Sequence, residues 1–400
     1  MNRIFSQRQR TDLDPSLYLE SHFDYLDRTA RPPFTAVRSQ MEEWLAQTSH
    51  SHRRDLAARL QSRDDHHFEA AFFEMYLGAL FAALGYQVQR HPRAGSRGRR
   101  PDFLVKHADF LPTLVEAATV DELTAPARAA RNRLIAIYDM LNTLHTPDFF
   151  FRIDTDGEPS TPVPLRTLRR HVEHFVQSIE YVNVSQAATD HGLDGMPTMT
   201  FDHAGCHIEI SVIPVSPARR GAINHRRVGL IGPVGGWIDD RTPIRDKIRL
   251  KANRYGHIRR PLVIAINAAG RHLDNIDIME ALFGRETFTF PGDQHGRSGE
   301  PVMTRQRDGA WVGPGGPHNR RVSAVLIVSS LLPWTLTADA HAPAIYLNPW
   351  ARYPITSQLS RINAYLPKDG RMELRRGDAM HNLLRLPEHW PFHIVDSPGL

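Results

Sequence analysis

The sequence of 400 residues contains a single cysteine, Cys206, and only four lysines. One cysteine excludes an internal disulfide framework, and a structural zinc site usually needs several thiolates, so neither is expected. The most apolar run, at 322–334, is shorter than the roughly 20 residues that cross a bilayer. Residues 1–12 are polar and lack the apolar core of a secretion signal. We therefore expect a cytoplasmic protein with no membrane partner.

Arginine carries nearly all of the positive charge. The chain has 49 lysine and arginine residues against 44 acidic ones, and its formal net charge is +5. This mild basic excess is compatible with a nucleic-acid partner but does not require one. An apolar content of 41% is ordinary for a protein with a sizeable core.

Residues 66–120 contain the most informative pattern in the chain. A long apolar segment predicts a helix that ends at Gly85, a residue suited to a left-handed C-cap. Residues 86–91 alternate between apolar and polar side chains, as in a strand. After a turn rich in glycine and arginine, PDFLV (101–105) and LVEAA (114–118) predict two further strands. The predicted order is thus one helix followed by three strands.

Three acids in this segment suit the hydrolysis of phosphodiesters. Glu74 lies in the helix, Asp102 begins a strand after a proline, and Glu116 lies in a strand between apolar neighbours. An acid inside such a strand is costly unless it is paired or binds a metal. Adjacent strands can bring Asp102 and Glu116 to a common edge, where Mg²⁺ prefers hard oxygen ligands from one or two carboxylates.

The Pro-Asp step at Asp102 and the sequence VEAA around Glu116 resemble the PD-(D/E)xK restriction-endonuclease-like superfamily. The segments FFEMYL, GYQVQRHP, RRPDFLV and KANRYG are similar to a narrower group of mostly actinobacterial nuclease-like proteins. The resemblance implies an α/β fold with a mixed sheet flanked by helices. It also implies Mg²⁺ or Mn²⁺ at Asp102, Glu116 and the Ala117 carbonyl, with Glu74, and further Glu69, as additional acids.

The chain departs from the superfamily pattern at Ala118, where the resemblance implies a lysine. Residues 243–255 predict a helix whose apolar stripe contains Ile244, Ile248, Ala252 and Tyr255. Lys251 falls within that stripe, and Lys247 lies at its edge. A lysine on an inward face is costly unless an acid is near. We therefore predict that Lys251, or else Lys247, supplies the missing cation, with the Lys251 ammonium within about 6 Å of the Asp102 or Glu116 carboxylate.

Four arginines in the turn at 92–100 are candidates for nucleic-acid binding: Arg93, Arg97, Arg99 and Arg100. A basic loop beside metal-binding acids is well placed to contact a phosphate backbone. The alternative is a solvated hairpin loop. Comparable alternatives apply elsewhere: Glu69 and Glu74 as solvated helix positions, Asp102 as a turn residue, and Lys251 as a lysine that extends to solvent.

We expect three regions: a helical N-terminal extension (1–64), a restriction-endonuclease-like core (65–270) with an insertion around 155–240, and an irregular C-terminal extension (271–400) that extends the core or packs on it. The sheet should have four to six strands, and the strand at 148–153 should extend it. The expected activity is that of a magnesium-dependent endonuclease, on DNA rather than RNA, in phage defence or repair and with a protein partner as an option. The alternative is a catalytically inactive nuclease fold that binds nucleic acid or forms part of a complex.

Overall fold

The structure is a computed structural model that describes residues 3–95, 98–121, 125–221, 226–231, 239–269, 273–289, 302–355, 358–369 and 371–392. The chain divides into two compact units. The first unit comprises Met1–Arg8, Pro32–Glu122 and Ile238–Leu400, and the second comprises Gln9–Arg31 and Leu123–Trp237. The second unit thus contains the region of the expected insertion together with a short segment from the N-terminal region.

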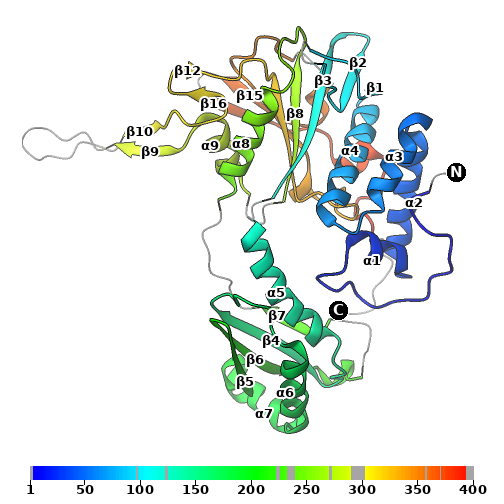
Figure 1. Ribbon diagram of the computed structural model, residues 1–400, viewed down its shortest axis with the longest axis vertical. Helices are drawn as coiled ribbons and strands as arrows, with labels where there is room; N and C mark the ends of the chain where they lie inside the picture. The colour runs from blue at the N-terminus through cyan, green and yellow to red at the C-terminus, as the bar shows by residue number, and fades with distance from the viewer. Residues whose placement is uncertain are drawn as a thin grey trace, which may run out of the picture. The chain divides into compact units, whose positions relative to one another are not determined.

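Across the described residues, eight strands of the first unit form one mixed sheet (Figure 1). In spatial order they are β1 (Gln87–Arg90), β2 (Phe103–His107), β3 (Phe110–Val120), β8 (Leu262–Ala268), β13 (Ala324–Ser329), β14 (Ala344–Leu347), β15 (Asn363–Lys368) and β16 (Arg371–Arg375). Strands β3, β8 and β13 are parallel to one another, and β14 is parallel to β15. The other neighbouring pairs are antiparallel.

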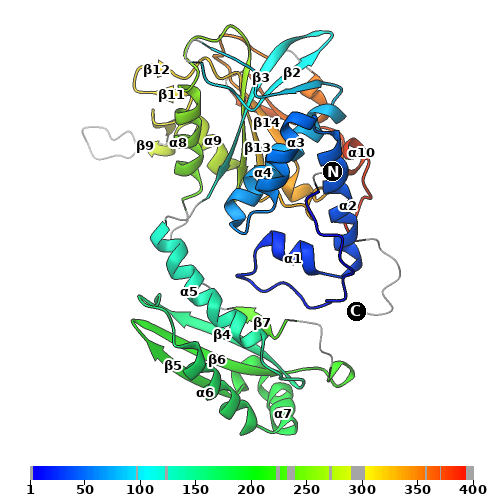
Figure 2. The ribbon, with the colours of Figure 1, turned by 45° about the vertical axis from the view of Figure 1, so that its right-hand side comes forward.

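The middle of this sheet is covered on both faces. Every residue of β8 is buried, as expected for an apolar strand between two helical layers. Helices α8 (Arg241–Ala252) and α9 (Asn275–Phe283) cover one face. Helix α4 (Asp65–Ala83) covers the other, and α2 (Pro32–Gln47), α3 (His50–Leu60) and α10 (Met380–Leu384) pack against α4 (Figures 1 and 2). The expected α/β class, a large mixed sheet flanked by helices, is confirmed.

Helix α4 and strand β1 form where the sequence predicts them. The side chain of Asp64 caps the helix by accepting hydrogen bonds from the backbone N–H groups of His66 and His67. The chain leaves the helix through Gly85, whose φ of 88° lies in the left-handed region. Leu84 is the C-cap of α4, and β1, the first strand of the sheet, begins three residues later at Gln87.

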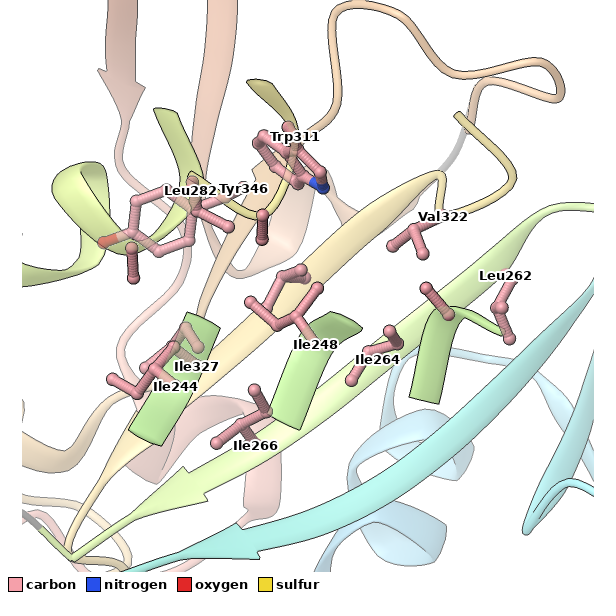
Figure 3. Packing of buried hydrophobic residues seen from close by; sticks show 14 of the residues in the cluster. Ile244, Ile248, Leu262, Ile264, Ile266, Leu282, Trp311, Val322, Ile327 and Tyr346 are labelled. Carbon is pink, nitrogen blue, oxygen red and sulfur yellow. The ribbon is translucent and has the colours of Figure 1, made fainter. Parts of the chain in front are cut away.

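Helix α8 packs on the sheet through the stripe predicted from its sequence, but the helix ends at Ala252 rather than at 255, so Tyr255 of the stripe lies in the turn after it. Ile244, Ile248, Ala252 and Tyr255 are all buried, with exposures of 1% or less. Ile244 and Ile248 belong to one apolar cluster with Ile264 and Ile266 of β8 and Ile327 of β13 (Figure 3). Burial of several large aliphatic side chains, at roughly 1.5–3 kcal/mol each, fixes the rotation of α8 about its axis. That rotation decides where its polar residues point.

The second unit has its own sheet and apolar core. Its described strands pair in the order β5 (Thr198–His203), β6 (Cys206–Pro214), β4 (Phe149–Asp156) and β7 (Val228–Ile231). Its helices are α1 (His22–Arg28), α5 (Ala125–Asn142), α6 (Leu165–Gln177) and α7 (Tyr181–His191). The prediction that the strand at 148–153 extends the core sheet is wrong, because both edges of β4 are occupied by β6 and β7.

The C-terminal region is more regular than the sequence suggested. It supplies β13, β14, β15 and β16, so the described sheet exceeds the expected four to six strands. Two short hairpins precede them: β9 (Glu286–Thr289) with β10 (Val302–Arg305), and β11 (Val312–Gly313) with β12 (Gly316–Pro317). Strand β16 (RMELR) alternates polar and apolar residues, but it is only five residues long and mostly exposed, so a buried face does not mark it as a strand.

Candidate active site

Glu116 occupies a buried position in the middle of the sheet. It lies on β3, where it is paired with Ile264 of the parallel strand β8, and it is only 1% exposed. Side chains alternate along a strand, so Glu116 points to the same face as Leu114 and Val120, which belong to the cluster under α8. A carboxylate at this depth requires charged or hydrogen-bonding partners.

Three side chains from the end of α8 and the turn after it satisfy the Glu116 carboxylate. The Lys251 ammonium lies 2.6 Å from Oε1, and a guanidinium nitrogen of Arg254 lies 2.7 Å from the same oxygen. The Tyr255 hydroxyl donates a hydrogen bond to Oε2. The predicted proximity of Lys251 to one of the two carboxylates is therefore confirmed. Lys251 is 16% exposed at its side chain, so the pair is largely shielded from water.

Arg254 and Tyr255 were not predicted as site residues. Tyr255 is predicted only as part of the apolar stripe, and Arg254 lies off that stripe in the predicted helix 243–255; in the structure both residues lie in the turn after α8. The available signal is the spacing of Lys251 and Tyr255, which places an ammonium and a phenol one helical turn apart on a buried face. Burial and the hydrogen bond to Glu116 raise the pKa of Tyr255, so the hydroxyl stays protonated and donates a hydrogen bond to the carboxylate.

Asp102 joins the same centre through the backbone of Ala117. It immediately precedes β2, and its Oδ2 accepts a hydrogen bond of 2.7 Å from the Ala117 N–H. The Ala117 carbonyl in turn accepts a hydrogen bond of 3.3 Å from Lys251. Burial, and next the negative charges of Glu116 and Glu74, raise the pKa of Asp102 to about 7, against the opposing effects of the Ala117 N–H and Lys251.

Glu74 is near this centre but has a partner of its own. Both of its carboxylate oxygens bind the Arg59 guanidinium at 2.7 Å, a bidentate pair between α3 and α4. Its charge still contributes to the raised pKa of Asp102. Arg59 is not predicted as a site residue, because the charged residues of α3 have the pattern of a solvated helix face.

Glu69 lies among other acids of the first unit. Burial, followed by the charges of Asp65, Asp121 and Asp64, raises its pKa to about 7. No group of three or more histidine, cysteine or acidic side chains suited to a metal ion occurs in the described part of the chain. The oxygen donors that the structure brings together are the Asp102 and Glu116 carboxylates and the Ala117 carbonyl.

Lys247 lies one turn before Lys251 on α8. It is half-buried, and its ammonium forms no hydrogen bond or ion pair with the residues that the structure describes. Burial and then the charge of Lys251 lower its pKa. Of the two candidate lysines, Lys251 is the one in contact with Glu116.

The side chain of Ala118, where the resemblance implies a lysine, points towards α8. Ala118 is two residues after Glu116 on β3, so its side chain points to the same face. It is partly buried and packs against the apolar cluster under α8. A cation is therefore contributed to this face by the neighbouring helix rather than by the strand.

The arginine-rich turn meets the turn after α8. A Cβ atom on Gly95 would overlap the carbonyl oxygen of Tyr255, and the φ of Gly95 is +70°, so only glycine fits at this contact. Arg93, Arg99 and Arg100 are exposed, whereas Arg97 lies outside the described residues. The loop is thus held beside the residues that bind Glu116.

Comparison of the chain with protein-family models, with curated proteins and with solved structures finds no match. Among the described helices, none is both long and apolar enough to cross a membrane. The functional assignment therefore depends on the geometry around Glu116.

Proposed function

We propose that the protein is a metal-dependent endonuclease with a restriction-endonuclease-like core, and that DNA is its substrate. The observation that carries this proposal is the contact between Lys251 and Glu116 at 2.6 Å. A lysine beside the strand acid is the feature that the sequence lacks at Ala118. The order α4, β1, β2, β3 also agrees with the helix and three strands on which the resemblance rests.

The oxygen donors around Ala117 fit Mg²⁺ or Mn²⁺. Two carboxylates, from Asp102 and Glu116, and one carbonyl, from Ala117, are hard ligands of the kind that Mg²⁺ prefers. The pKa of Asp102, raised to about 7, reflects burial and the proximity of other acids, and a divalent cation would relieve both. A bound metal ion supplies activation of water and neutralisation of charge on the leaving oxygen. Through its charge Glu74 would add to the negative field at Asp102.

The chain's own cations have a separate role. The ammonium of Lys251 lies in a largely water-excluded position, where a positive charge stabilises developing negative charge more strongly than in water. We assign to Lys251 the orientation of the attacking water and the stabilisation of charge on the phosphate. Arg254, which shares Oε1 of Glu116, holds the carboxylate in place while Lys251 acts.

Exposed arginines support binding of a nucleic acid. Arg93, Arg99 and Arg100 form no ion pair with the described residues, and Gly95 places their loop beside Tyr255. Such contacts give affinity without sequence information. The proposed setting is the cytoplasm, in phage defence or repair, where a protein partner would provide target recognition.

One observation favours a second candidate function. Lys251, Arg254 and Tyr255 together engage both oxygens of Glu116, and the Lys251 ammonium also engages the Ala117 carbonyl. These internal contacts use the atoms that a metal ion would need. In the alternative, the protein is an inactive nuclease fold that binds nucleic acid or forms part of a complex.

Cleavage of plasmid and linear DNA separates the two functions. The wild type should cleave when Mg²⁺ or Mn²⁺ is added and not in excess chelator, whereas Glu116→Gln should bind DNA without cleaving it. Glu116→Gln keeps the shape of the side chain, so its melting temperature serves as the control for folding. Metal-independent binding by the wild type, with no cleavage under any metal condition, would establish the inactive fold instead.

A further inference from the structure

A cavity of about 460 Å³ opens beside the turn that follows α8. Three arginines, Arg320, Arg321 and Arg352, and two histidines, His257 and His318, belong to its lining. None of the described residues that line it is acidic. We call this feature the basic cavity. Convergent charges of one sign in a hollow produce a strong local potential that attracts anions.

Backbone and side-chain hydrogen bonds hold the walls of the basic cavity together. Arg352 donates its N–H to the Arg320 carbonyl at 2.7 Å, and Arg320 Nε donates to the Trp350 carbonyl at 3.1 Å. A guanidinium nitrogen of Arg321 donates to the Gly256 carbonyl at 3.3 Å. The loop before β13, the loop after β14 and the turn after α8 are thereby joined in one wall.

The three guanidinium groups of the basic cavity are not neutralised. Arg320, Arg321 and Arg352 form no ion pair with a carboxylate among the described residues. In the same unit, Arg59 pairs with Glu74 at 2.7 Å, so nearby arginines do find acids where their role is structural. Three like charges around one hollow repel one another, and an anionic ligand would remove that repulsion.

The basic cavity adjoins the Glu116 centre along the chain. Asn253 and Gly256 line the cavity, whereas Arg254 and Tyr255, the two residues between them, bind Glu116. Consecutive Cα atoms are about 3.8 Å apart, so one short turn has its backbone in the cavity wall and two side chains on the carboxylate. A chain of phosphates that reaches the carboxylate centre would have its neighbouring groups at the cavity.

We propose that the basic cavity binds the phosphodiester backbone of DNA, next to the phosphate that reaches the Glu116 centre. This inference rests on the proposed function and specifies where the DNA backbone runs next to the Glu116 centre. Guanidinium groups bind phosphate oxygens in pairs of parallel hydrogen bonds, and a rigid wall keeps them in position. The contacts give affinity and position the strand, and they carry no sequence information.

The test is the salt dependence of DNA binding by the full chain, measured by fluorescence anisotropy with a short labelled duplex and without divalent metal. The variant combines Arg320→Ala, Arg321→Ala and Arg352→Ala. The charge-matched control combines Arg371→Ala, Arg375→Ala and Arg376→Ala, three exposed arginines that do not line the basic cavity. Between about 50 and 200 mM salt, the cavity variant should lower the slope of log K against log salt by at least about one more than the control.

A single variant covers the case in which the triple variant fails to fold. The Arg352 side chain forms no hydrogen bond with the described residues, so Arg352→Glu leaves the ties between the walls intact. It should weaken binding at least about tenfold at low salt. Equal effects of cavity and control variants, a slope change below one, or no binding of DNA by the wild type would each overturn the proposal.

Failure of this proposal differs from failure of the proposed function. Cavity-dependent binding without any metal-dependent cleavage would refute the endonuclease and support the basic cavity as a DNA site. Metal-dependent cleavage with a cavity variant that binds and cuts like the wild type would support the endonuclease and overturn the cavity proposal.

Discussion

Replacing Lys251 with methionine tests the centre most directly, because the change removes the charge and retains most of the apolar stem. Removal of one partner from a fully buried ion pair costs about 3–5 kcal/mol. Here Arg254 and Tyr255 still bind the Glu116 carboxylate, and the Lys251 side chain is 16% exposed. We therefore expect a smaller loss in the free energy of unfolding, about 1–3 kcal/mol, in urea titrations.

The effect of Lys251→Met on turnover should be much larger than its effect on folding. Loss of one preorganised charge or donor at a reacting centre typically lowers kcat by about 100-fold or more. The comparison variant is Lys247→Met, on the same helix and without a hydrogen bond to the described residues. Adding Ala118→Lys to Lys251→Met should restore part of the activity, because residue 118 points to the same face. Full cleavage by Lys251→Met, or loss of cleavage only in Lys247→Met, would refute the assignment.

Three further changes probe the surroundings of the centre. Asp102→Asn should abolish cleavage and leave DNA binding intact. Because the pKa of Asp102 is raised to about 7, the wild type loses free energy of unfolding as pH rises through 7, and the asparagine variant should not show this loss. A variant that is less stable than the wild type in urea unfolding at pH 8 would contradict this. Arg99→Ala with Arg100→Ala should lower the salt slope of DNA binding by about two, and an unchanged slope would mean that the loop faces away from DNA. Glu69 has a pKa raised from 4.5 to about 7, so the cost of burying its charge is absent below about pH 4.5 and fully present above about pH 7. Glu69→Gln should therefore raise the free energy of unfolding at pH 8 by up to about 3 kcal/mol and at pH 4 by little, whereas parallel pH profiles would contradict the shift.

The position of Lys251 could be predicted because two simple rules act on the same residue. Ile244 and Ile248 fix the inward face of a helix by their spacing, and a lysine on that face requires an acid. Tyr255 was placed on the same stripe, but its hydrogen bond to Glu116 was not predicted. Arg254 could not be placed in the same way, because it lies off the stripe in a turn whose conformation depends on tertiary contacts. The ion pair between Arg59 and Glu74 could not be predicted either, because the periodicity of one helix gives no information about its contacts with another helix.

The extent of the sheet was harder to predict than its centre. The buried strand β8 is apolar apart from Asn267, a pattern typical of a strand between two layers. Strand β14 is short, β15 contains Pro367 and ends exposed, and β16 is mostly exposed, so no buried apolar face marks them and each is defined by pairing with a neighbour. Strand β4 pairs with β6 and β7 in a separate sheet. The choice of pairing partner depends on the other strands available, and the sequence of β4 alone does not specify it.

The second unit interrupts the chain between β3 and α8, and this has a consequence for the order of synthesis. Lys251 follows Glu116 by 135 positions, and most of the residues between them belong to the second unit. On the ribosome, Asp102 and Glu116 leave the exit tunnel long before the cation that neutralises them, and β8 and β13 emerge later still. At the usual rate of about 5–20 residues per second, the nascent chain carries an unpaired acid for several seconds or more. Burial of Glu116 under α8 with its partners is possible only after α8 has been made, and β3 gains its parallel neighbour β8 later still.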